Sequence, residues 1–172
     1  MKNLVSIVIG VIVLLIGVRW FMQQSAAKEA FDKTPYYTPE MGEGLYRGVL
    51  SFERTIPPET IALEKERSNA LELTMAQASD PNARRVNIDI GYMDLDKVVL
   101  PSYKRGPFKL YAGNGVWLDM LLTYAKGQFH PTAWAFEDFK RNPYQHDLQL
   151  IRERYKKAGS GKDSSNETAV RL

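Results

Sequence analysis

The sequence contains no cysteine and only two histidines among its 172 residues. The lack of cysteine excludes disulfide bonds, thiolate metal sites, haem attachment through thioethers and a cysteine nucleophile. It also excludes a lipoprotein, because the acylated residue of a lipoprotein is a cysteine. A chain without free thiols suits an oxidising compartment, where an unpaired thiol is a liability.

The central part of the chain also lacks a basic excess. The formal net charge is +3 at pH 7, but the surplus positive charge lies at the two ends of the chain. Between residues 28 and 151, acidic side chains slightly outnumber basic ones. A nucleic-acid-binding domain needs a basic patch to neutralise phosphates, so the charge distribution argues against nucleic acid as a partner.

Common catalytic motifs are absent from the sequence as well. It has no G-x-S-x-G nucleophile elbow, no H-E-x-x-H zinc pair and no phosphate-binding glycine loop. We therefore expect a non-enzymatic protein without a cofactor or a bound metal. The alternative is a membrane-tethered hydrolase or metal-dependent enzyme that uses Asp89, Asp94, Asp96 and His130. Oxygen ligands this close together suit Mg²⁺ or Ca²⁺, but a solvated strand face and a hairpin turn explain the same three carboxylates.

The most distinctive feature that is present is an apolar segment near the N-terminus. Residues 4–18 are interrupted only by Ser6, Gly10 and Gly17. Arginine and tryptophan follow, and both suit the headgroup region of a bilayer. With these flanking residues the segment is long enough to cross a membrane as one helix over residues 4–22. The residues assigned to this predicted anchor are Leu4, Ile9, Gly10, Leu14, Gly17, Arg19 and Trp20.

A cleaved signal peptide is the competing interpretation of residues 1–27. Lys2 would be its charged start, and Ser25-Ala26-Ala27 would be its cleavage site. Arg19 and the aromatic residues after it put charge and bulk where a signal peptide usually has small neutral residues. We therefore favour a retained single-pass signal-anchor. The positive charges on its two flanks do not decide its orientation. Because a three-residue N-terminus before a large C-terminal domain usually stays cytoplasmic, we expect the domain on the exported side, in the periplasm or another extracytoplasmic space.

The rest of the chain divides into three parts. Residues 28–44 contain repeated proline and glycine and are expected to form a linker. Residues 45–157 are expected to form one globular α+β domain, in which several helices pack on a short, mainly antiparallel sheet. Residues 158–172 are polar, without an apolar face, and are expected to be a disordered tail.

Apolar spacing assigns the elements of this domain. Alternation of apolar and polar residues predicts strands, whereas recurrence every three or four residues predicts helices. Strands are expected at residues 86–90, 98–100 and 108–111. Helices are expected at residues 44–54, 58–78 and 116–126, in a short stretch after Thr132, and after Pro143.

Aromatic residues are concentrated between positions 117 and 144. Most of them must lie in the core, but any exposed ring would form a binding surface, since aromatic anchors dominate interface energetics. We therefore expect a membrane-anchored subunit or assembly factor of an envelope complex, which binds a protein partner or a second copy of itself. The candidate partner-binding residues are Trp134, Phe136, Phe139, Tyr36 and Tyr37.

Overall fold

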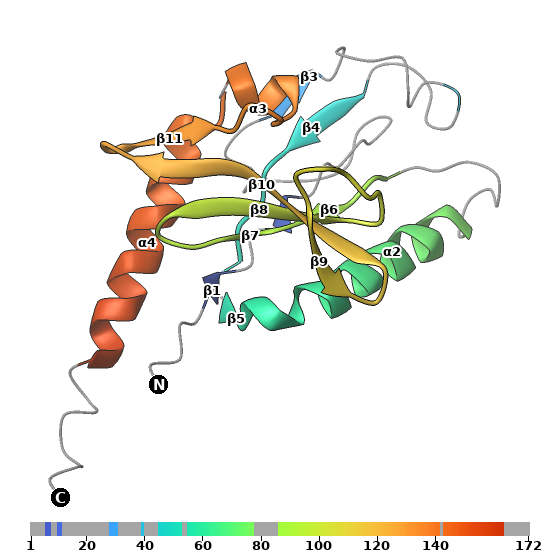
Figure 1. The fold of residues 1–172 in the computed structure, drawn as a ribbon, viewed down its shortest axis with the longest axis horizontal. Coiled ribbons are helices and arrows are strands. Elements are labelled where there is room, and N and C mark those ends of the chain that lie inside the picture. The colour runs from blue at the N-terminus through green and yellow to red at the C-terminus, as the bar shows by residue number, and fades with distance from the viewer. Residues whose placement is uncertain are drawn as a thin grey trace, which may run out of the picture.

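The protein is described by a computed structural model for residues 6–7, 10–11, 28–30, 39, 45–52, 55–77, 86–141 and 143–163. Helices pack on a small sheet in which every described strand pair is antiparallel (Figure 1). The predicted α+β class is therefore confirmed.

A seven-stranded sheet forms the centre of the domain, in the order β11-β10-β8-β7-β1-β5, with β9 also paired to β10. Two further pairs, β2–β6 and β3–β4, lie outside it. The strands are β1 (Ser6–Ile7), β2 (Gly10–Val11), β3 (Lys28–Ala30), β4 (Tyr46–Gly48), β5 (Thr55–Ile56), β6 (Asp89–Ile90), β7 (Tyr92–Met93), β8 (Lys97–Ser102), β9 (Leu110–Gly113), β10 (Val116–Ala125) and β11 (Gln128–Pro131). The helices are the 3-10 helix η2 (Pro58–Thr60), α2 (Ile61–Gln77), α3 (Glu137–Arg141) and α4 (Gln145–Asp163).

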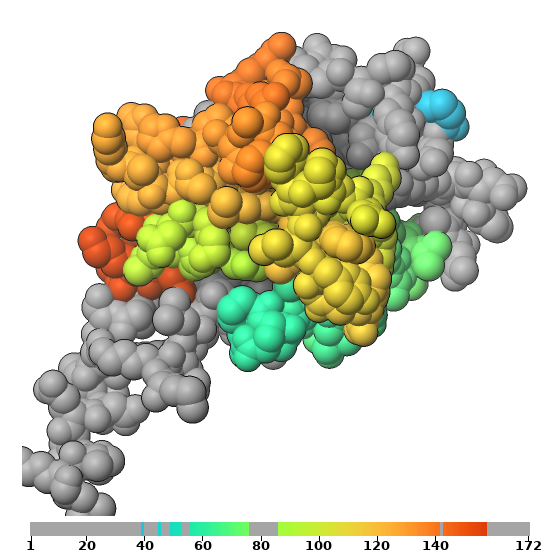
Figure 2. Space-filling model, viewed as in Figure 1, coloured from blue at the N-terminus to red at the C-terminus, as the bar shows by residue number. Residues whose placement is uncertain are grey.

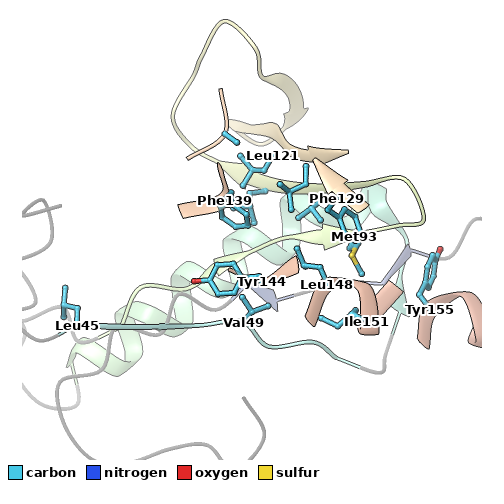
Figure 3. Close-up of a cluster of buried hydrophobic side chains, with 14 residues drawn as sticks. Leu45, Val49, Met93, Leu121, Phe129, Phe139, Tyr144, Leu148, Ile151 and Tyr155 are labelled. Carbon is cyan, nitrogen blue, oxygen red and sulfur yellow. The ribbon is translucent and has the colours of Figure 1, made fainter. Parts of the chain in front are cut away.

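The two faces of the sheet contact different helices. Successive side chains of a strand point to opposite faces, so Val98 and Leu100 of β8 face one way and Val99 faces the other. Val98 and Leu100 belong to the larger core, which includes residues from α3 and α4. Figure 3 shows this cluster, with Phe139, Tyr144 and Leu148 among its labelled side chains. Val99 instead belongs to a smaller cluster with Ile61 of α2.

The helix expected at residues 116–126 is wrong, because this segment is the ten-residue strand β10. Both faces of β10 are covered, and such a strand has an apolar run that spacing alone does not separate from a helix. A bulge between Met120 and Leu122 shifts the register, so that Leu121 and Leu122 both enter the larger core. This irregularity removes the alternation that would have indicated a strand.

Turns with positive φ enclose β10 at both ends. Before it, Gly113, Asn114 and Gly115 have φ of 95°, 50° and 73°, and after it Lys126 and Gly127 have φ of 49° and 82°. Glycine and asparagine adopt this left-handed region more readily than other residues. Gly127 therefore closes the β10–β11 hairpin, directly after the segment for which a helix was expected.

The short helix expected at residues 44–54 is also wrong, because Tyr46–Gly48 form β4. Leu45 and Val49 are buried in the larger core. Residues four apart share a face in a strand as well as in a helix, so their spacing did not distinguish the two. The helix expected at residues 58–78 is confirmed as η2 and α2.

The other predicted strands and helices are found with altered bounds. Strand 98–100 corresponds to β8, and strand 108–111 to β9, which begins two residues later. In the segment 86–90 only Asp89–Ile90 form a strand, and Asn87 is buried although the alternation would place it outside. The helix expected after Thr132 is α3, which begins at Glu137. The last helix, α4, extends to Asp163, past the predicted start of a disordered tail at residue 158.

The described residues of the apolar N-terminal segment lie in strands rather than in the expected helix. β1 pairs with β5 and β7, and β2 pairs with β6. Of the predicted anchor residues, Gly10 lies in β2, and the other six are outside the described residues. None of the helices that the structure describes is both long and apolar enough to cross a bilayer. Within the predicted linker, β3 pairs with β4, and Tyr36 and Tyr37 are outside the described residues.

The β10–β11 turn allows a direct test of the strand assignment. Replacing Gly127 by alanine should lower the free energy of unfolding by about 1–2 kcal/mol, because a Cβ at φ of 82° is strained. No atom lies within 4 Å of that Cβ position, so the loss comes from the backbone alone. Urea unfolding followed by far-ultraviolet circular dichroism measures it. Gly127→Asn is the control and should lose about half as much or less, since asparagine tolerates this region; equal losses would contradict the turn.

Candidate functional site

One edge of β10 is shared by two strands with a gap between them. β11 pairs with residues 122–125 of β10, and β9 pairs with residues 116–118, whereas β8 pairs along the other edge. Residues 119–121 therefore have no strand partner on the first edge among the described residues. We refer to the edge formed by residues 119–121 as the β10 gap.

Side chains from the segment after β11 bond to the β10 gap. Thr132 Oγ1 and Trp134 Nε1 both donate to the carbonyl oxygen of Met120, over 3.1 Å and 3.0 Å. The backbone N–H of Thr132 donates to the carbonyl of Leu121 over 2.9 Å. Exposed strand edges need partners for their backbone groups, and here these bonds also fix the position of the Trp134 ring.

The segment before β9 reaches the same gap from the opposite end. The Lys109 ammonium lies 3.4 Å from Oδ2 of Asp119. The aliphatic stem of Lys109 packs over Gly106, where an added Cβ would lie 3.3 Å from Lys109 Cε. The neighbouring ring of Phe108 stacks on Trp134, with centroids 4.6 Å apart and planes inclined by 10°. Two loops far apart in the sequence are thus joined across the gap.

Three aromatic side chains of the two segments that reach the β10 gap are exposed to solvent. The exposed fractions are 58% for Phe108, 36% for Trp134 and 52% for Phe136. Figure 2 shows the segments that contain them, in yellow and orange, side by side on one face of the molecule. We refer to these three residues as the aromatic face.

Phe139, which was also predicted to bind a partner, is not part of this surface. It is 4% exposed and packs near Tyr144, with ring centroids 6.1 Å apart. Its ring belongs to the larger core, so a partner has no access to it in the folded domain. The expectation for Phe139 is therefore corrected.

The carboxylates of the enzyme alternative stabilise the local structure. Oδ1 of Asp94 accepts the backbone N–H groups of Asp96 and Lys97 over 2.8 Å and 2.9 Å, and Oδ2 pairs with the Lys97 ammonium. Burial disfavours the charged form of Lys97, but the hydrogen bond and the charge of Asp94 outweigh it, so the pKa of Lys97 is raised. These contacts close the β7–β8 hairpin.

The remaining residues of that alternative do not form a metal site. Asp89 Oδ2 accepts a hydrogen bond from Asn87 over 2.9 Å. His130 is exposed, and its Nε2 lies 3.0 Å from the carbonyl oxygen of Ala125. Within the described ranges, no three histidine or acidic side chains are grouped so as to hold a metal ion. The geometry therefore gives the metal-dependent reading no support.

A second group of buried polar residues lies between α2 and β6. Lys65 is only 6% exposed, and its ammonium lies 3.5 Å from the carbonyl of Ile88 and 3.8 Å from Asp89. Glu72 accepts the backbone N–H of Ile88, and the buried hydroxyl of Ser68 donates to the Lys65 carbonyl over 2.9 Å. These contacts connect α2 to the strand that follows it.

The sequence analysis did not single out the residues that form the β10 gap and the polar group between α2 and β6. Lys65 follows Ile61 by one helical turn, so its position on the buried side of α2 was a usable signal. Asp119 is the one acidic residue within the apolar run of β10, which is a second usable signal. No pattern in the sequence indicated that Phe108 stacks on Trp134.

The Lys65 ammonium is expected to contribute little to stability. Its contacts are long, and desolvation of a buried charge offsets the attraction that it gains. Lys65→Met keeps the stem and should unfold within about 1 kcal/mol of the unchanged chain, or be more stable. Lys65→Ala should lose about 1–3 kcal/mol, because it removes packed methylene groups. Urea unfolding measures both, and a larger loss in Lys65→Met than in Lys65→Ala would show that the charge itself is required.

Comparison with known proteins places the domain in a family. No significant match was found among the curated proteins or among the solved structures. A family model described as a domain of unknown function, DUF4416, matches residues 20–155. This match spans most of the chain and includes the β10 gap and the buried residues of α2. The chain therefore belongs to the DUF4416 family.

Proposed function

We propose that this chain is a single-pass membrane-anchored, non-enzymatic subunit or assembly factor of an envelope complex. Its α+β domain binds a protein partner through the aromatic face. The observation that carries the proposal is the exposed stack of Phe108 on Trp134, whose indole is held by the carbonyl of Met120.

The arrangement of these rings favours tight contact with another protein. Aromatic side chains supply a large apolar area, and they are enriched among the residues that dominate binding energies. A ring already fixed by a hydrogen bond and a stacking contact loses little conformational freedom when a partner binds. Phe136 lies two residues after Trp134 and is more than half exposed, so the proposed surface takes rings from two separate segments.

Membrane attachment is supported by the sequence around the start of the family domain. The family match begins at residue 20, immediately after the apolar run of residues 4–18 and its arginine. The same residues cannot pair in β1 and β2 and also cross a bilayer. The strand-paired and inserted forms are therefore alternatives for one segment. We assign the inserted form to the chain in its native membrane, with the domain on the exported side.

Site-specific photo-cross-linking in native membranes tests the partner surface. A photoreactive phenylalanine analogue at Phe136 should give a discrete cross-linked product. The same analogue at Leu73 of α2, which is 63% exposed, should not, because Leu73 lies in α2 and the smaller cluster that α2 joins contains none of the three rings. Trp134→Ala should weaken recovery of that partner about tenfold or more, as expected for an aromatic anchor. Cross-linking from residue 73 alone, or equal yields from both positions, would contradict the proposed surface.

Single-cysteine labelling tests the anchor, and the absence of native cysteine makes the signal unambiguous. In intact membranes Val11→Cys should resist a water-soluble maleimide, whereas Lys157→Cys on the exposed part of α4 should react from the exported side. Protection of Val11→Cys arises in a paired strand as well, so membranes are also washed at alkaline pH. The anchored chain stays in the pellet; release into the wash would show the strand-paired form and disprove the anchor.

A further inference from the structure

The carboxylate of Asp119, at the β10 gap, is only partly satisfied. Asp119 is 5% exposed, and the Lys109 ammonium reaches Oδ2 at 3.4 Å, which is longer than a charge-assisted hydrogen bond. Oδ1 is buried and has no hydrogen-bond partner among the described residues. Buried carboxylate oxygens are normally paired, and an unpaired one is costly. This oxygen is therefore a buried acceptor that the described residues leave unsatisfied.

Asp119 is connected to the aromatic face through two neighbouring residues, Lys109 and Met120. Phe108 precedes Lys109 in the chain, and Trp134 bonds to Met120, the residue after Asp119. A ligand that donates to Oδ1 therefore approaches a carboxylate whose neighbours in the chain, and whose lysine partner's neighbour, hold the two stacked rings. The site combines one acceptor of negative charge with flat aromatic surface.

We infer that the β10 gap binds an arginine side chain of the protein partner. A guanidinium is flat, carries five donors and stacks on aromatic rings, whereas an ammonium is a compact point charge. Among the described residues, an arginine already lies over an aromatic ring at two places, with Arg105 5.9 Å from the Trp117 ring centre and Arg152 3.6 Å from that of Tyr124. The inference rests on the proposed function, because it specifies the chemistry of the partner at the aromatic face.

Binding requires a small local rearrangement. Oδ1 of Asp119 is covered in the free domain, so the covering side chains must shift as the guanidinium enters. Lys109 keeps its contact with Oδ2, and the arginine supplies the donor that Oδ1 lacks. Two cations on one carboxylate repel each other, so Lys109 limits the affinity of the site.

The test uses the full chain in mild detergent with N-acetyl-argininamide as the probe. The Trp134 indole N–H signal in a nuclear magnetic resonance spectrum, assigned through Trp134→Phe, should shift and saturate as the probe is added. N-acetyl-citrullinamide has nearly the same shape without the charge. Its affinity should be lower by at least about tenfold, the factor expected for loss of a charged hydrogen bond. Equal binding of the two probes would overturn the inference.

Variants assign the effect to one carboxylate. Asp119→Asn should remove the preference for argininamide over citrullinamide. Glu137→Gln is the matched control beside Phe136: this exposed carboxylate accepts a 2.8 Å hydrogen bond from Lys140, which lowers the pKa of Glu137, and the change should leave the preference intact. If Glu137→Gln removed the preference for argininamide and Asp119→Asn kept it, the charge preference would belong to Glu137 and the inference would be overturned.

Lys109→Met keeps the test decisive if Asp119→Asn fails to fold. This variant removes the competing ammonium, so argininamide should bind severalfold more tightly, and unchanged or weaker binding would contradict the inference.

The arginine site and the proposed function are contradicted by different results. Cross-linking from residue 136 that persists in Asp119→Asn, without any charge preference in the probe experiment, overturns the arginine site alone. Absence of a cross-linked partner in the unchanged chain overturns the proposed function.

Discussion

Strand β10 is the element on which the rest of the domain depends. It pairs with β8 along one edge and with both β9 and β11 along the other. Its side chains enter both hydrophobic clusters, with Leu121 and Leu122 in the larger one and Leu118 and Met120 against the smaller one. Any change that moves this strand therefore disturbs both cores, three neighbouring strands and the candidate site together.

The candidate site follows from how β10 is paired. Two strands share one edge and leave residues 119–121 between them, so backbone carbonyls there need other donors. Thr132 and Trp134 supply those donors, and the tryptophan ring is thereby held at the surface. A bond that satisfies a strand edge thus also orients the ring that we assign to partner binding. Among the described residues, the Lys109 ammonium approaches the Asp119 carboxylate at 3.4 Å and no donor reaches its Oδ1, which is the basis of the arginine site that we propose.

The elements that could be predicted from the sequence are those whose apolar spacing and length fit only one kind of secondary structure. The helix at residues 58–78 was recovered because prolines mark its start and its length exceeds that of a strand. β10 was missed because it is covered on two faces and carries a bulge, and β4 was missed because a spacing of four residues fits both a strand and a helix. The spacing of apolar residues shows which side chains are buried, but helices and strands both have buried side chains, so spacing alone does not always separate them.

The candidate site was predictable only in part. Trp134 and Phe136 stood out as members of an aromatic cluster, but composition did not separate them from the buried Phe139. Phe108 and Lys109 come from a loop whose position depends on the β9–β10 hairpin. An interaction between two loops is set by strand pairing, which one sequence does not reveal. Asp119, in contrast, could have been found from the sequence, since a single acid within an apolar strand has to find a partner or remain unsatisfied.

The proposed anchor and the proposed partner surface involve different parts of the sheet. In the strand order, β8 and β7 separate β1 from β10, and the contacts of the β10 gap come from residues 108–109 and 132–134. Withdrawal of residues 6–11 into a bilayer would uncover β7 on the side where β1 now pairs, but it would remove no bond from the gap. The proposed partner surface would therefore be the same before and after the proposed membrane insertion. The aromatic face therefore depends on the fold of β8 to α3 and not on where the first residues of the chain reside.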